Sequence, residues 1–297
     1  KAKDVVPGFD GVSAAALKKM AVDADTFFFV GSHYLTQGTP AEATAAASAL
    51  ASSLDVMRDA NPKLVRHLQY VVPKQAATEA AVMGALKGHA DSLSMNAVEL
   101  PGLLSRLHAG GHSSFVVDEY QHRDASEEPA AMLDGGVALS EAMQLGRVHL
   151  HGLLGDLVVV DHVGPGGTVD VERTRLALLR ARQLASVKAA NDSGEITCRD
   201  DVFDVAPVVQ GKCLAAVQRF ADAVAARYGL DVDGRAAVVR DWHYFDASAQ
   251  RHVFFVPSRG IHERTGGTVS LGDTIDISAL VFSSTNERPK PHPRLAT

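Results

Sequence analysis

A glycine-rich segment near the carboxyl end of the chain holds the residues best suited to chemistry. It runs from Thr265 to Ile275, and its glycines let the backbone approach a ligand closely. The chain then enters a predicted helix at 273–282, whose first amides point outward with a positive partial charge that suits phosphate. Asp273 at that terminus is placed to accept a proton from a substrate hydroxyl while the amides hold an anionic phosphoryl group. An N-cap aspartate after a glycine turn gives the same pattern.

A histidine provides a second candidate contact. His151 lies near the carboxyl end of a predicted strand at 148–151. Open α/β sheets bind ligands at this end of their strands, which favours a cofactor contact. A histidine that is held structurally by hydrogen bonds fits the same position.

Short apolar runs alternate with helical segments along most of the chain, and these elements must position the candidate residues. A buried strand is predicted at 27–30, and a helix follows from Thr39, which forms a capping box with Glu42. Alternation of this kind predicts βαβ units and a parallel sheet covered by helices on both faces. The further predicted strands are 64–72, 92–95, 114–117, 157–160, 236–244 and 252–256, and the further predicted helices are 76–88, 97–108, 127–145, 171–190 and 211–228.

Composition excludes several classes of function. The chain has 29 Lys and Arg against 35 Asp and Glu, a formal charge of −6, so no electrostatic footprint for nucleic acid is visible. We expect no membrane span, because no apolar run approaches about 18 residues, and the polar start lacks a signal-peptide core. Cys198 and Cys213 are the only cysteines, which excludes a disulfide framework and predicts a reducing, cytoplasmic location.

The segment Val269 to Ile275 resembles the T-V-G-L-G-D-T-I signature near the carboxyl end of ADP-dependent glucokinases and phosphofructokinases, members of the ribokinase-like superfamily. Residues 29–33 resemble that family's S-G-x-H turn, residues 94–100 its L-N-E-x-E-L segment, and residues 147–151 its R-I-H-x-H segment. The order of these segments also matches the family. The resemblance implies an α/β fold, a ribokinase-like three-layer α/β/α sandwich with a mainly parallel central sheet. It places the nucleotide site and the catalytic aspartate in a large-domain portion at 1–285, followed by an irregular tail at 286–297.

The resemblance also implies roles for the glycine-rich segment. Asp273 would be the general base that deprotonates the sugar hydroxyl, and the neighbouring amides would form the anion hole. Ser270 stands where the family has the first glycine of G-x-G-D, so it keeps the amide but would be strained at a positive φ. The residues expected at the site are Ser270, Leu271, Gly272 and Asp273 for catalysis, and Thr268 and Val269 for the nucleotide.

Three further positions follow from the resemblance. Asn96 and Glu99, the family's N-x-x-E pair, would help to place magnesium and the nucleotide phosphates, although their spacing also fits a helix capping box. Gln69 stands where the family has the glutamate of its H-x-E motif, which supports the metal. An amide is a poorer partner for Mg²⁺ than a carboxylate, but it can orient a metal-bound water.

The expected function is therefore an ADP-dependent sugar kinase that transfers a phosphoryl group from Mg-ADP to a hydroxyl of glucose or a hexose phosphate. Two alternatives stay open. The substitutions at Gln69 and Ser270 fit a catalytically weakened or inactive kinase-fold protein that acts as a binding or assembly subunit. The residues also fit an ATP-dependent ribokinase-like sugar kinase.

The matched segments all belong to the second half of a longer fold. The resemblance thus implies that the strands and lid at the amino end of the family are missing from this sequence. We expect a missing N-terminal segment or a complementary chain, in addition to the small-molecule partners, a sugar and a nucleotide.

Overall fold

The computed structural model describes residues 12–36, 38–73, 75–115, 127–190, 211–258, 275 and 278–280. The chain divides into two compact units, one of residues 1–169 and 207–262 and the other of residues 170–206 and 263–297. Over the residues described, no helix is both long enough and apolar enough to cross a membrane.

A seven-stranded sheet forms the centre of the first unit. Its strand order is β1-β2-β3-β4-β5-β9-β8. Pairings from β1 to β4 are parallel, and those from β4 through β5 and β9 to β8 are antiparallel, so five of the seven strands run in one direction. The strands are β1 Thr26–Val30, β2 Val65–Gln69, β3 Ser92–Asn96, β4 Arg147–His151, β5 Gly155–Asp161, β8 His243–Asp246 and β9 Arg251–Pro257; a separate two-stranded hairpin joins β6 Val163–Gly164 to β7 Gly167–Thr168.

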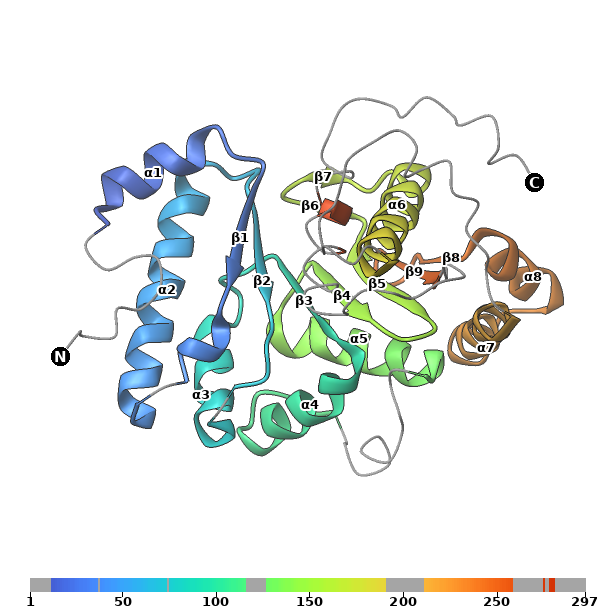
Figure 1. The fold of residues 1–297 in the computed structure, drawn as a ribbon, viewed down its shortest axis with the longest axis horizontal. Helices are drawn as coiled ribbons and strands as arrows, with labels where there is room; N and C mark the ends of the chain where they lie inside the picture. The colour runs from blue at the N-terminus through green and yellow to red at the C-terminus, as the bar shows by residue number, and fades with distance from the viewer. Residues whose placement is uncertain are drawn as a thin grey trace. The chain divides into compact units, whose positions relative to one another are not determined.

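Helices line one face of this sheet. Strands β1 to β4 lie side by side in chain order, so crossovers of a single hand place every connecting helix on the same side. Neighbours along this layer are α2, α3, α4, α5 and α7, and α5 packs on β4 and β5 (Figure 1). The helices of the unit are α1 Ala14–Val22, α2 Pro40–Ala60, α3 Ala76–Leu86, α4 Leu100–Ala109, α5 Pro129–Met143, α7 Gly211–Tyr228 and α8 Val232–Asp241, with short 3₁₀ turns η1 Ser32–Tyr34 and η2 Ala97–Glu99.

The two faces of the sheet differ in chemistry. The face under the helix layer is apolar, because alternate residues such as Leu68, Leu93 and Leu150 belong to the hydrophobic core. The opposite face carries the strand residues that alternate with these apolar ones, and they include a row of buried polar side chains. These are His67, Gln69, Ser92, Ser94, His149, His151, Asp156 and His252.

Most of the predicted elements are confirmed. The capping box at the start of α2 forms as expected, with the Thr39 hydroxyl accepting from the Glu42 amide and the Glu42 carboxylate accepting from the Thr39 amide. Cys213 is buried on the apolar stripe of α7. The mainly parallel α/β fold is thereby confirmed.

Two strand predictions are wrong. Residues 114 and 115 form no strand, and 116–117 lie outside the described residues. Most of the predicted strand at 236–244 is the second half of α8, and only its last two residues belong to β8. Helix α8 forms because Asp231 caps its start, where Oδ1 accepts a hydrogen bond from the Gly234 amide at 2.8 Å.

The second unit contains α6, Val171–Ala190. The Asp170 carboxylate accepts a hydrogen bond from the Arg173 amide in its first turn, at 3.0 Å. Within the predicted helix at 273–282, Ile275 and residues 278–280 are helical.

Candidate active site at the carboxyl ends of the strands

Three of the predicted site residues lie along one edge of the sheet, on its polar face. Gln69 is the last residue of β2 and pairs with Ser94, which lies two residues before Asn96 on β3. Asn96 in turn pairs with His151, the last residue of β4. Because paired residues of neighbouring strands share a face, the side chains of Gln69, Asn96 and His151 project from the same side of the sheet. The structure thus brings together residues that are far apart in sequence.

Glu99 joins this edge from η2, directly after β3. The Asn96 side-chain amide donates to Glu99 Oε1 at 3.5 Å, and Asn96 provides no side-chain cap to η2, so the capping box considered for this pair is incomplete. Burial raises the pKa of the Glu99 carboxyl. Hydrogen bonds from Asn96 and the charge of His151 act in the opposite direction, whereas the charge of Glu79 adds to the rise in pKa. Glu99 Oε2 is buried and accepts no hydrogen bond from any residue that the structure describes.

A buried acid next to Glu99 was not predicted from the sequence. Glu79 on α3 is only 1% exposed, and its carboxylate accepts hydrogen bonds from the Tyr70 hydroxyl and from Arg106 Nε. Arg106 Nη2 also contacts the Tyr70 hydroxyl oxygen at 3.2 Å. Burial and the neighbouring Glu79 raise the pKa of Tyr70 well above its ordinary value. Arg106 therefore compensates the charge of the Glu79 carboxylate in part. The remaining negative charge contributes to the raised pKa of Glu99.

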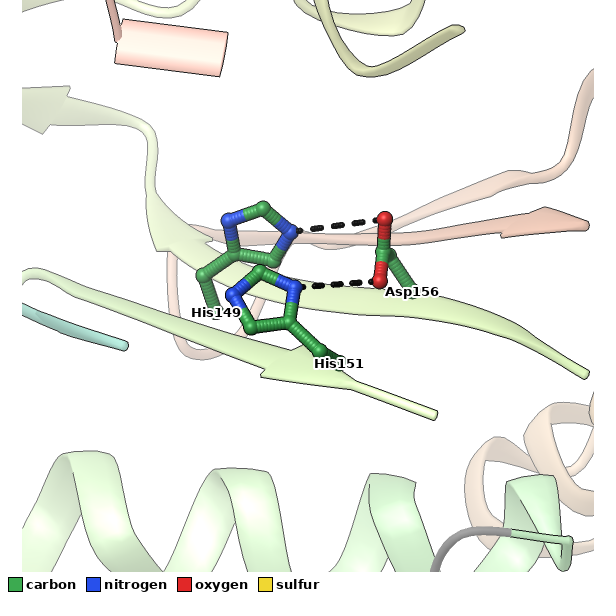
Figure 2. A group of neighbouring side chains, drawn as sticks. All are labelled: His149, His151 and Asp156. Carbon is green, nitrogen blue, oxygen red and sulfur yellow. Dashed lines mark hydrogen bonds and ion pairs between the residues drawn. The ribbon is translucent and has the colours of Figure 1, made fainter. Parts of the chain in front are cut away.

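Asp156 lies opposite His151 and interacts with two histidines (Figure 2). His151 Nδ1 lies 3.1 Å from Asp156 Oδ1, and His149 Nε2 lies 3.8 Å from Asp156 Oδ2. All three side chains are buried, and the two imidazole rings meet edge to face with their centroids 4.3 Å apart. His149 and His151 are two residues apart on β4, which places both rings on the face from which Asp156 projects.

Gln69 is buried on the same face. Its backbone carbonyl accepts a hydrogen bond from the Ser32 hydroxyl at 3.2 Å, and the residue is 7% exposed. Two residues earlier on β2, the two ring nitrogens of His67 each lie 2.8 Å from a hydroxyl, one of Ser92 and one of Ser94. An uncharged amide thus stands in a buried position on this face.

The predicted catalytic segment lies outside the described residues. It comprises Thr268, Val269, Ser270, Leu271, Gly272 and Asp273. What the structure shows is therefore the sheet edge at Gln69, Asn96, Glu99 and His151. Its carboxylate and amide oxygens are of the kind that hold Mg²⁺, directly or through water, and the buried Glu99 Oε2 is available to such a ligand.

Comparisons with known proteins were made on the sequence and on the fold. A sequence profile described as "ADP-specific Phosphofructokinase/Glucokinase conserved region" matches residues 13–282. A comparison with curated protein sequences gave no match.

Several solved structures share the fold. One is described as the last common ancestor of ADP-dependent phosphofructokinases from Methanosarcinales, at 19% identity and a TM-score of 0.77, with 96% of this chain and 56% of that chain covered. Another is an ADP-dependent kinase in complex with fructose-6-phosphate and ADPβS, at 19% identity and a TM-score of 0.74, covering 93% of this chain and 57% of that one.

A third similar structure is a phosphofructokinase from Pyrococcus horikoshii OT3 with AMP, at 16% identity and a TM-score of 0.69, covering 91% of this chain and 53% of that chain. The chain therefore spans a little over half the length of the solved structures that it matches. At these identities the structures establish the fold, and the sequence profile, which covers most of the chain, establishes the family. The chain belongs to the ADP-specific phosphofructokinase/glucokinase family.

Proposed function

We propose that this chain carries the nucleotide-binding and catalytic portion of an ADP-dependent sugar kinase, which transfers a phosphoryl group from Mg-ADP to a hydroxyl of glucose or a hexose phosphate. The observation that supports this most strongly is the buried oxygen of Glu99 beside Asn96, at the carboxyl edge of the sheet in a member of this family. Ligands of open α/β sheets bind at that edge.

The residues at the edge fit magnesium. Glu99 supplies a carboxylate, and Asn96 and Gln69 supply amide oxygens, all of them hard oxygen donors. When bound, the ion would neutralise charge on the nucleotide phosphates and hold their orientation. Gln69, which lacks a charge, would act through a metal-bound water. His151 uses Nδ1 toward Asp156, so a contact to the nucleotide would use its other ring nitrogen, Nε2.

The remaining steps are assigned to the glycine-rich segment. Asp273 would accept the proton of the sugar hydroxyl as the bond to phosphorus forms. The amides of Leu271, Gly272 and Asp273 would hold the oxygens of the transferred group, with Ser270 beside them, and Thr268 and Val269 would contact the nucleotide. Positioning and electrostatic stabilisation would provide most of the rate enhancement, as is usual in phosphoryl transfer.

The test is production of AMP. Purified full-length protein is incubated with Mg²⁺, ADP and a panel of sugars that includes glucose and fructose-6-phosphate. We expect sugar-dependent AMP in the wild type and a loss of about 10²-fold or more in Asp273→Asn, since general base catalysis contributes 10²–10⁴-fold. No AMP with any sugar, or full activity in the variant, would refute the proposal. Parallel reactions with ATP separate an ADP-dependent kinase from an ATP-dependent one.

Gln69 favours a second candidate, a kinase-fold subunit that binds a partner without catalysis. The amide occupies a buried position on the polar face where the family has a carboxylate. Calorimetry distinguishes the two candidates. Binding of Mg-ADP supports the kinase, whereas no nucleotide binding together with stable co-purification of a partner chain supports the subunit.

A further inference from the structure

We propose that His149, His151 and Asp156 form a binding site for a first-row transition-metal dication such as Zn²⁺, next to the magnesium-nucleotide site proposed above, with which it shares His151. The three side chains, drawn in Figure 2, come from the two neighbouring strands β4 and β5. The site depends on none of the kinase assignments.

The geometry already approaches that of a metal centre. One ring nitrogen of each histidine and one oxygen of Asp156 all lie within 4.8 Å of one another. Ligands at about 2.0–2.2 Å from a tetrahedral ion are separated from each other by roughly 3.3–3.6 Å. The contacts of 3.1 and 3.8 Å to Asp156 fall on either side of that range. The two contacts reach different oxygens of Asp156, so the side chains must draw closer together to surround one ion.

The chemistry of the donors selects the kind of ion. Two imidazoles and one carboxylate suit Zn²⁺, Co²⁺, Fe²⁺ or Mn²⁺, whereas Mg²⁺ and Ca²⁺ prefer ligand sets made of oxygen alone. Three protein donors leave a fourth position for water, as in open zinc sites.

Burial supplies the driving force. Asp156 is 0% exposed and lies 3.1 Å from His151 Nδ1, and a buried carboxylate is stabilised by a cationic partner. A dication at this point would add two positive charges beside the carboxylate, and neutral imidazole is the form that binds metals.

The framework around the donors is rigid. His151 and Asp156 are directly paired residues on antiparallel strands, and His149 lies two residues away on the same face. The strands are held from the other side by α5, which approaches so closely that a Cβ at Gly136 would lie 3.1 Å from Leu157 Cδ2. A bound ion would therefore link β4 to β5 beside the carboxyl edge without a rearrangement of the backbone.

The test is metal binding by the complete 297-residue chain after chelator treatment. Co²⁺ is titrated and its visible absorption recorded, and Zn²⁺ is then used to displace it. We expect one Co²⁺ per chain with the intense bands of a four- or five-coordinate ion, displacement by one equivalent of Zn²⁺, and no displacement by Mg²⁺ at the same concentration. Absence of binding, or displacement by equimolar Mg²⁺, overturns the proposal.

Substitutions locate the ion. His149→Gln and Asp156→Asn are each expected to weaken Co²⁺ binding by about a hundredfold or more, because even outer-shell partners contribute about 10–100-fold. The matched control is His89→Gln, which removes the histidine of another His–Asp pair, His89 with Asp55 at 2.9 Å, and should leave the affinity unchanged. Unchanged binding in both site variants overturns the proposal.

A second readout applies to the wild type and does not depend on whether the variants fold. In a chain labelled with ¹⁵N-histidine, Zn²⁺ should shift the ring-nitrogen resonances of two of the 13 histidines strongly. Shifts at no histidine, or at histidines other than His149 and His151, contradict the site. A failed kinase assay leaves this result standing, and a failed metal titration leaves the proposed kinase function standing.

Discussion

The buried oxygen of Glu99 offers a direct test of nucleotide binding at the scale of one residue. In Glu99→Gln the side chain keeps its shape but loses the charge that would compensate Mg²⁺. We expect the affinity for Mg-ADP to fall by about tenfold or more, the range seen when partners around a metal are removed. Isothermal titration calorimetry measures this affinity. Glu141→Gln is the control, because Glu141 is an exposed glutamate on α5 that interacts with Arg251 at 3.5 Å, and equal affinities in the two variants would contradict the role of Glu99.

Three histidines joined by hydrogen bonds predict that the stability of the protein depends on pH. His252 lies between two others, with its Nε2 2.9 Å from His162 Nδ1 and its Nδ1 2.8 Å from His243 Nε2. Burial, and then the charge of His162, lower the pKa of His252 below its ordinary value of 6.5. The unfolded chain therefore binds this proton more readily than the native one, so the stability that His252 provides is present above pH 6.5 and is lost as the pH falls below it.

Urea unfolding at pH 7.5 and pH 5.5 measures this effect. In His252→Gln, the amide keeps a donor and an acceptor but does not titrate, and we expect the difference in unfolding free energy between the two pH values to shrink. His108→Gln, a change at a hydrogen bond near the surface, should leave the difference as it is in the wild type. If His252→Gln shows the same difference in unfolding free energy as the wild type, groups other than His252 cause the pH dependence.

Sequence reasoning identified some of the edge residues and missed others for a physical reason. Gln69 and Asn96 were found through the resemblance to the family's H-x-E and N-x-x-E motifs, and His151 was found because it lies near the carboxyl end of a predicted strand. The structure brings the three to one edge because parallel strands end on the same side. Asp156 was missed, although the four residues between His151 and Asp156 are a usual hairpin length that would have paired them. Glu79 was not accessible to such reasoning, because its burial depends on Tyr70 and Arg106 from other elements.

At the scale of elements, the close contact of α5 with β4 and β5 determines how firmly His149, His151 and Asp156 are held. A Cβ at Gly136 would lie 3.1 Å from Leu157 Cδ2 and 3.3 Å from Leu150 Cδ1. Gly136→Val adds three carbons there, so we expect the free energy of unfolding to fall by about 1–3 kcal/mol through overpacking. Urea denaturation measures this change in free energy. In the control, Gly211→Val, an added Cβ meets nothing within 4 Å, and a similar loss in both variants would exclude the close contact as the cause.

The element predictions succeeded where local signals were strong. Helix α2 begins where Thr39, Pro40 and Glu42 indicate, because capping is a property of neighbouring residues. The strand predicted at 236–244 was wrong because Asp231 caps a helix that runs through most of these residues. Residues rich in valine fit either a strand or a buried helix face, and the packing of Val238 in the hydrophobic core decides between them.

At the scale of the whole molecule, the order of β1 to β4 follows from the βαβ alternation, but the antiparallel half of the sheet does not. The pairing of β5 with β9 joins residues about 90 positions apart, and no local pattern encodes it. The family was therefore predicted from the order of the motifs, and the profile match to residues 13–282 confirms it.

Strand β1 leads to a prediction about the chain in solution. It lies at the end of the sheet and pairs only with β2 among the described residues, which makes its outer edge a candidate for pairing with another strand. Its run of three phenylalanines has high β-propensity, and Val30 at its end is 50% exposed.

We therefore expect the isolated chain to self-associate through β1 as its concentration rises, which sedimentation velocity measures. Val30→Lys should weaken association about tenfold or more, since charged side chains protect sheet edges, whereas Val232→Lys on α8, where the valine is 82% exposed, should not. A wild-type chain that stays monomeric at all concentrations, or equal effects of the two lysines, would show that this edge is closed to other chains.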